Sequence, residues 1–250
     1  MTDALHLTAE SDKPRSVQRV AWFGGSFDPP HLGHLAIARA AQAALHLDQV
    51  LFAPVAAQPL KPQGSTASYE DRLEMTQLAV KDDPAFTVSI ADAPRADGAP
   101  NYTWQTLTLL RDQFAPGSEL FFLMGADSLT GFRNWRCACE IPFLAHLIVA
   151  SRPGESLEDM EALLPEGLKL IAKDVEACGF GEASVDLHSY ALRDQTGRSA
   201  AFYLLPGLEI EISATEIRQQ IWQPSPARVE AYSALPIPVS DYIRSRCLYQ

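Results

Sequence analysis

The sequence has no apolar run close to the ~20 residues that a helix needs to cross a bilayer. Residues 1–16 mix Asp, Glu, Lys and Arg with small residues, and they lack the apolar centre of a secretion signal. We therefore expect residues 1–16 to form a mobile leader. We also expect the protein to be cytoplasmic and to have no membrane partner.

Cysteine is scarce, with four in 250 residues. Cys137 and Cys139 are separated by a single residue, while Cys178 and Cys247 stand alone. The paired C-x-x-C or Cys/His spacings of zinc knuckles are absent. The sequence therefore predicts reduced thiols in a cytosolic protein and gives no reason to expect structural zinc.

Positive charge is also in short supply, with 20 Lys and Arg against 31 Asp and Glu and a formal net charge of −11 at pH 7. No Lys/Arg cluster or stripe stands out. A protein that neutralises many nucleic-acid phosphates is normally basic or carries such a stripe. We therefore expect no nucleic-acid partner, and any anion must bind in one small, local pocket.

What the sequence does contain is an alternation of short β-branched or aromatic runs with longer helical patterns. Strands are predicted at Val17–Phe23, Val50–Pro54, Phe86–Ile90, Leu120–Met124, His146–Ser151 and Ala201–Leu205. Helices are predicted at Leu32–Leu45, Tyr69–Val80, Tyr102–Phe114 and Leu157–Leu163. This order favours an α/β fold of the Rossmann-like kind, an open, mostly parallel sheet with helices on both faces. Ligands of such sheets bind beyond the carboxyl ends of the strands.

Two stretches depart from that alternation. Lys173–Ser199 is polar, weakly periodic and interrupted by glycines, and we expect it to be a long surface excursion. Residues 212–250 are divided by four prolines and predict a small helical C-terminal part of two or three helices. No repeat or linker separates these parts, so we expect residues 17–250 to form a single domain. Within the Tyr69–Val80 helix, Arg72 is expected at the surface and Met75 in the core.

The residues with the strongest chemical signal follow the first predicted strand. They read Gly24-Gly25-Ser26-Phe27-Asp28-Pro29-Pro30-His31-Leu32-Gly33-His34. The two adjacent glycines let the backbone turn sharply and approach a ligand closely. The prolines suit a helix entrance, and the helix start presents amide donors and a positive dipole end to an anion. His31 and His34, three residues apart, lie on one face of that first turn.

This loop is therefore predicted to hold the phosphates of a nucleotide. It lacks the Lys-Ser/Thr ending of a P-loop and does not match G-x-G-x-x-G, so both of those phosphate cradles are excluded.

A second candidate anion site lies at Ile212–Arg218, which reads I-S-A-T-E-I-R. Ser213 and Glu216 form a capping-box pattern that predicts a helix starting at Ser213. The free amides, the Ser213 and Thr215 hydroxyls and the Arg218 guanidinium would converge there. Taken alone, the same pattern also fits an ordinary capped helix with a surface arginine.

Together the two stretches resemble signatures of the nucleotidylyltransferase superfamily, the HxGH motif and its I-S-x-T/S-x-I-R partner. More narrowly, the chain resembles the bacterial nicotinate-nucleotide adenylyltransferases, from about Val20 to Tyr249. Further matching stretches are Gly125-Ala126-Asp127, Phe132 with Trp135, Arg152-Pro153-Gly154 and Val239-Ser240-Asp241-Tyr242-Ile243.

Members of that family are enzymes that transfer the adenylyl group of ATP to nicotinate mononucleotide, giving deamido-NAD and pyrophosphate in NAD biosynthesis. The resemblance implies that His31 and His34 hold the phosphates and stabilise charge on the α-phosphate, while Ser213 and Arg218 bind the leaving pyrophosphate. The ATP-binding residues that it implies are Gly24, Gly25, Ser26, Phe27, Gly33, Gly125, Asp127 (at the ribose), Ser213 and Thr215. Mg²⁺ is expected to be held by phosphate oxygens and water, with no protein ligand.

For the acceptor, the resemblance implies that Lys61 holds the phosphate of the mononucleotide and that Trp135 stacks on the pyridine ring. The backbone near Thr103 would meet the carboxylate of the ring, and Arg152 would belong to the same pocket.

The chain departs from the family pattern at Leu60, where His is usual, and at Gln105, where Asp is common. Both departures concern the acceptor side. From the residues alone, Trp135 could also be a core aromatic, Lys61 a solvated lysine and Asp127 a helix cap.

Other functions stay open at this point. The same chemistry could act on nicotinamide mononucleotide or on another phosphorylated acceptor such as phosphopantetheine. A catalytically silent nucleotide-binding regulator would share the fold, but the complete set of His31, His34, Ser213 and Arg218 favours the enzyme. ATP and nicotinate mononucleotide are the expected partners, and a homo-oligomer is left open.

Overall fold

The computed structural model describes residues 16–56, 64–151, 160–180, 183–205, 212–223 and 226–249. Residues 1–15, nearly all of the expected leader, lie outside this part of the chain, as do Lys61 and Arg152.

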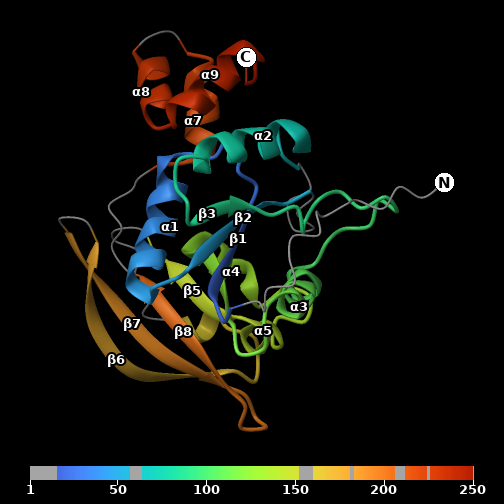
Figure 1. Cartoon of the computed structure of the whole chain (residues 1–250), viewed down its shortest axis with the longest axis vertical. Coiled ribbons are helices and arrows are strands. Elements are labelled where there is room, and N and C mark those ends of the chain that lie inside the picture. Colours follow the sequence, from blue (N-terminus) through green and yellow to red (C-terminus); the bar gives the residue numbers. More distant parts are fainter. Residues whose placement is uncertain are drawn as a thin grey trace.

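An eight-stranded sheet runs through the described residues (Figure 1). Its strands are β1 (Arg19–Gly25), β2 (Gln49–Pro54), β3 (Phe86–Val88), β4 (Glu119–Gly125), β5 (His146–Ala150), β6 (Lys169–Phe180), β7 (Ala183–Arg193) and β8 (Ser199–Leu205). They are ordered β3-β2-β1-β4-β5-β8-β7-β6. The first six in this order pair in parallel, whereas β7 is antiparallel to both β8 and β6. The prediction of an open, mostly parallel sheet is confirmed.

The helices agree with the sequence pattern where it predicted them, but the two short helices Ala126–Phe132 and Ile141–Leu144 were not predicted. They are α1 (Leu32–Leu45), α2 (Tyr69–Val80), α3 (Thr103–Gln113), α4 (Ala126–Phe132), α5 (Ile141–Leu144), α6 (Met160–Leu163), α7 (Ala214–Ile221), α8 (Ala227–Ser233) and α9 (Ile237–Ser245). The predicted limits of α1 and α2 are those observed. α3 is one residue shorter at each end because Tyr102 and Phe114 have extended backbones. Within the described residues, no helix has the length and apolarity to span a membrane.

Successive residues of the central strands serve opposite faces of the sheet. On β1, Phe23 belongs to the core cluster shared with α1, whereas Trp22 belongs to the cluster shared with α3 and α4. On β4, Phe121 and Phe122 divide in the same way. Strands buried on both faces read as unbroken apolar runs, which explains why these strands were easy to predict.

The helices α7, α8 and α9 stand at one end of the molecule and pack on α2 instead of the sheet (Figure 1). Met75 of α2 is fully buried among Ile217, Val239 and Ile243 from these helices. The predicted helical C-terminal part is therefore confirmed, with its own hydrophobic cluster.

The stretch Lys173–Ser199 is not the surface excursion that its composition suggests. Most of it belongs to β6 and β7, a long antiparallel hairpin that extends the sheet beyond β8 (Figure 1). On β7, Leu187 and Leu192 are buried, in the clusters on the two faces of the sheet. The prediction was wrong because pairing with β8 and packing under α1 supply the stability that the local sequence pattern lacks.

Candidate active site

A cavity of about 930 Å³ opens at the carboxyl ends of β1 and β4. From β1 the chain proceeds outward to β2 and β3, and it then returns to form β4 on the other side of β1. At such a switch point the loops that follow the two strands diverge and leave room for a ligand. Gly24 and Gly25 line the cavity from the end of β1, and Gly125 lines it from the end of β4.

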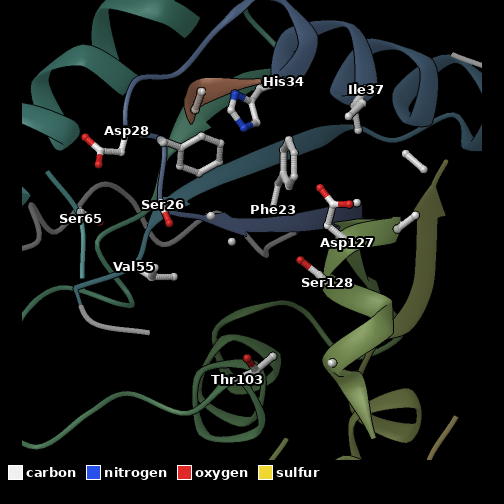
Figure 2. A pocket seen from close by; sticks show the side chains of 18 of the residues that line it. Phe23, Ser26, Asp28, His34, Ile37, Val55, Ser65, Thr103, Asp127 and Ser128 are labelled. Atoms are coloured by element: carbon white, nitrogen blue, oxygen red, sulfur yellow. The ribbon is translucent and has the colours of Figure 1, made fainter. Parts of the chain in front are cut away.

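Most residues that the sequence singles out lie on the wall of this cavity. They are Gly24, Gly25, Ser26, Phe27, His31, Gly33, His34, Thr103, Gly125, Asp127, Trp135, Ser213, Thr215 and Arg218. Figure 2 shows Ser26, His34, Asp127 and Thr103 reaching the cavity from the loop after β1, from α1, from α4 and from α3. The placements of Lys61 and Arg152 stay predictions.

The loop between β1 and α1 is fastened through its carbonyl groups by two arginines. Arg72 Nη1 donates to the Ser26 carbonyl at 2.6 Å, and Arg218 Nη1 donates to the Asp28 carbonyl at 2.6 Å. The Ser26 and Asp28 carbonyls are thus satisfied by side chains from α2 and α7. With these two acceptors engaged elsewhere, the loop suits an anion that binds through N–H groups.

Arg72 corrects the expectation that it lies on the surface of α2. Its side chain is 1% exposed. Burial lowers the pKa of the Arg72 guanidinium, while the nearby Asp28 carboxylate counteracts that shift. A helical pattern cannot distinguish a surface arginine from one that fastens a neighbouring loop, because the partner lies 46 positions away in the chain.

The two histidines lie at the start of α1, as their spacing predicts. His31 is the N-cap residue, and the His31 and His34 rings stack with centroids 3.7 Å apart. The His31 backbone N–H donates to His34 Nδ1 at 3.2 Å. An Nδ1 that accepts a hydrogen bond leaves the proton of the neutral ring on Nε2. His34 is thereby set up as an Nε2–H donor at a helix start whose dipole also favours an anion.

The second candidate anion site is the start of α7. Ser213 is its N-cap residue with an extended backbone, as predicted. In the described part of the chain the Ser213 side chain makes no capping hydrogen bond, so the predicted capping box is wrong although the helix begins where expected. Arg218 Nη2 instead donates to the Thr215 hydroxyl at 3.3 Å. Ser213, Thr215 and Arg218 all line the cavity.

Trp135 lies between the core and the cavity, so both interpretations left open by the sequence stay possible. Its ring centroid lies 5.9 Å from that of Phe122 and 5.6 Å from that of Phe132, so the indole packs against the core. The same residue lines the cavity and is only partly buried. The ring is held by the core while one surface of it faces the ligand space.

Asp92, Tyr102 and Arg136 also line the cavity, and the sequence assigned none of them a role. The Arg136 guanidinium lies 4.8 Å from the centre of the Tyr102 ring. Asp92, which follows β3 and is 3% exposed, accepts a hydrogen bond from the Thr106 hydroxyl of α3. Burial raises the pKa of Asp92, and that hydrogen bond offsets the shift only in part.

The cytidylyltransferase-like family model matches residues 22–220 of the chain. The chain belongs to the cytidylyltransferase-like family. It is also 36% identical, over 93% of its length and 99% of the relative's, to a Herpetosiphon aurantiacus protein named "Probable nicotinate-nucleotide adenylyltransferase". A Roseiflexus castenholzii protein of the same name is 35% identical over 93% of this chain and 98% of its own length. This likeness places the chain among the nicotinate-nucleotide adenylyltransferases within the larger family.

Solved structures show the same fold. Plasmodium falciparum nicotinic acid mononucleotide adenylyltransferase complexed with NaAD superposes with a TM-score of 0.64, covering 93% of this chain and 97% of that one. The same protein complexed with APC gives the same TM-score. With 14% and 13% sequence identity, these likenesses concern the fold alone.

For this member of the cytidylyltransferase-like family, the sequence revealed the motifs that line the cavity better than the buried residues that hold those motifs in place. Asp28 stands inside the recognised loop, yet nothing in the sequence indicated which groups its buried carboxylate would meet. Arg72, Asp92 and Arg136 come from three separate elements and share no spacing. Asp92 and Arg136 are marked only by their place on the cavity wall, and Arg72 only by its contact with the loop between β1 and α1.

Proposed function

We propose that the chain transfers the adenylyl group of ATP to nicotinate mononucleotide, giving nicotinate adenine dinucleotide and pyrophosphate. The observation that carries the proposal is the convergence of two helix starts, α1 with His34 and α7 with Arg218, on one cavity at the sheet switch point. Membership of the nicotinate-nucleotide adenylyltransferases supports the choice of substrates.

On the phosphate side, His31 and His34 bind the α-phosphate of ATP, and Ser213 with Arg218 binds the β- and γ-phosphates. Each helix start adds amide donors and a positive dipole end to its side chains. Gly24 and Gly25 let the triphosphate lie close to the backbone. Gly125 and Asp127, at the end of β4 and the start of α4, hold the adenosine, with Asp127 at the ribose.

A phosphate oxygen of the mononucleotide attacks the α-phosphorus of ATP in line. One P–O bond forms, the bond from the α-phosphorus to the bridging oxygen breaks, and pyrophosphate leaves with the electron pair. The His34 Nε2–H donor neutralises charge on the α-phosphate oxygens, and Arg218 neutralises charge on the leaving group. Such a transfer depends on positioning and charge stabilisation and needs no covalent nucleophile.

Magnesium fits this site as a partner of the nucleotide. Among the described residues no three His, Cys, Asp or Glu side chains come together as metal ligands. We expect the ion to take its ligands mainly from ATP phosphate oxygens and water. Bound in that way, Mg²⁺ supplies further neutralisation of the phosphate charge.

On the acceptor side, the exposed part of Trp135 stacks on the pyridine ring, and the backbone at Thr103 meets the ring carboxylate. Lys61 and Arg152 complete this proposal as sequence-based predictions, with Lys61 at the acceptor phosphate. Both segments that carry them continue from residues on the cavity wall, Gly64 and Ser151.

The test is pyrophosphate release from ATP and magnesium, with nicotinate mononucleotide and nicotinamide mononucleotide assayed in parallel. We expect the acid to be used with much the higher kcat/KM. Preference for the amide would keep the phosphate site and overturn the acceptor assignment. Folded protein that binds ATP and turns over neither compound would point to another phosphorylated acceptor or to a silent regulator.

A further inference from the structure

The carboxylate of Asp28 is buried at the edge of the cavity and accepts hydrogen bonds from three distant residues. Its Oδ2 accepts the Thr66 N–H at 2.6 Å, and its Oδ1 accepts the Ala67 N–H at 3.1 Å. The Tyr249 hydroxyl donates to the same Oδ1 at 2.7 Å. Asp28 is 4% exposed and Tyr249 is 7% exposed, so these donors replace the water that the carboxylate lacks.

Arg218 lies next to the Asp28 carboxylate. Its Nη1 donates to the Asp28 carbonyl and lies 4.0 Å from Asp28 Oδ2, which is longer than a hydrogen bond. The guanidinium thus lies between the Asp28 carboxylate and the ligand space that it lines. An anion bound in that space would compete with the carboxylate for it. Opposite charges attract strongly at such distances in a partly buried site, so the donors already on Asp28 decide how far Arg218 is drawn toward it.

Tyr249 reaches Asp28 from the opposite end of the chain, across 221 positions. It is held in the hydrophobic cluster of α7 to α9, together with Ile217 and Ile243. Its φ of 60° lies in a region that residues other than glycine adopt at an energetic cost. Burial raises the pKa of Tyr249, and the Asp28 carboxylate raises it further, so the hydroxyl remains a donor throughout the neutral pH range.

We propose that Tyr249 is a positioning residue for the phosphate side: by occupying Asp28 Oδ1, it keeps the Arg218 guanidinium available to the triphosphate. Without the hydroxyl, the Asp28 carboxylate lacks one donor and draws Arg218 toward itself. The charge of Arg218 is then withdrawn from the ligand. The inference rests on the proposed function in one respect, which is that the anion beside Arg218 is the triphosphate of ATP.

The experiment compares Tyr249→Phe with Tyr242→Phe. Tyr242 is a matched control, since its hydroxyl also joins the C-terminal helices to an aspartate, donating to Asp71 Oδ1 at 2.9 Å, and it is not on the cavity wall. We expect Tyr249→Phe to raise the Kd for MgATP, measured by calorimetric titration, about 5- to 10-fold. Tyr242→Phe should leave that Kd within about 2-fold of the wild type, although it removes a comparable hydrogen bond.

A double-mutant cycle tests whether Tyr249 acts through Arg218. In an Arg218→Gln background, Tyr249→Phe should no longer change the Kd for MgATP, because the charge that it redirects is absent. An equal effect in both backgrounds would overturn the proposal, as would equal Kd values for the two tyrosine variants. If Tyr249→Phe is too unstable for titration, the rise in melting temperature produced by MgATP supplies the same comparison.

The same measurements distinguish a failure of the proposed function from a failure of the role of Tyr249. A wild-type chain that binds MgATP but turns over neither mononucleotide would overturn that function, and the Kd ratio of the variants would still decide the role of Tyr249. A wild-type chain that does not bind MgATP would overturn the role of Tyr249 itself.

Discussion

The proposed phosphate side of the cavity comes from two short, nearly continuous stretches, residues 24–34 and 213–218. The proposed acceptor side is assembled from separate loops after β3, before α3 and after α4. Phosphates are recognised by backbone donors and a few charges at helix starts, and one local segment can supply all of them. A flat ring and its substituents need surfaces from several directions, which only tertiary packing can bring together. The two sides should therefore respond differently to substitution.

The largest effect is expected at His34. His34→Ala should lower kcat about 100-fold or more while the protein stays folded, because it removes a donor placed at the reacting phosphate. His46→Asn is the matched control, since His46 ends the same helix, is exposed, and has a left-handed backbone that Asn tolerates. Turnover is measured by pyrophosphate release and folding by circular dichroism. Near-normal turnover of His34→Ala would remove His34 from the mechanism.

Gly24 and Gly125 both line the cavity but differ in what an added side chain would meet. A Cβ on Gly24 would lie 2.5 Å from a ring atom of Trp22, which is 2% exposed and cannot yield. Gly24→Ala should therefore lower the free energy of unfolding by about 1–3 kcal/mol in denaturant titrations. A Cβ on Gly125 would meet nothing within 4 Å. Gly125→Ala should cost less than about 1 kcal/mol but raise the KM for ATP, since Gly125 lines the cavity.

Loss of stability in Gly125→Ala with an unchanged KM for ATP would contradict this division between the two glycines.

The acceptor side should show a pH dependence of stability that comes from Asp92. Because burial raises its pKa, the folded state keeps a proton that the unfolded state has lost, starting near the unfolded pKa of about 3.9. Stability therefore falls as pH rises from there to the higher folded pKa. Asp92→Asn keeps an oxygen that can accept from Thr106 and should flatten this fall. Melting temperatures of both proteins across that pH range provide the check, and parallel curves would exclude Asp92 as the cause.

The smallest expected effect is spectroscopic. Nicotinate mononucleotide should quench part of the tryptophan fluorescence, because the pyridine ring covers the exposed part of Trp135. Trp135→Phe should lose that quench. Trp222→Phe should keep it, since Trp222 is 64% exposed and does not line the cavity. A quench that survives in Trp135→Phe would place the acceptor ring elsewhere.

The limits of sequence-based prediction follow the same division between local and distant causes. α1 and α2 could be predicted to the residue, because their periodicity and starting residues are local. The β6–β7 hairpin could not, because it is stabilised by β8 and α1. Ser213 shows both cases in one residue, since its pattern gave the start of α7 correctly but not the partners of its hydroxyl.

The sequence by itself determined the glycine-rich loop after β1, the helix start at Ser213, the alternation of strands and helices, and the family resemblance, because each depends on residues that are neighbours in the chain. Only the tertiary structure decided that Arg72 is buried beneath the loop, that Asp92 and Arg136 line the cavity, and that Tyr249 donates to Asp28. Those facts depend on contacts between segments far apart in the chain. A buried charge is acceptable only where distant partners satisfy it, and sequence spacing does not show where such partners will meet.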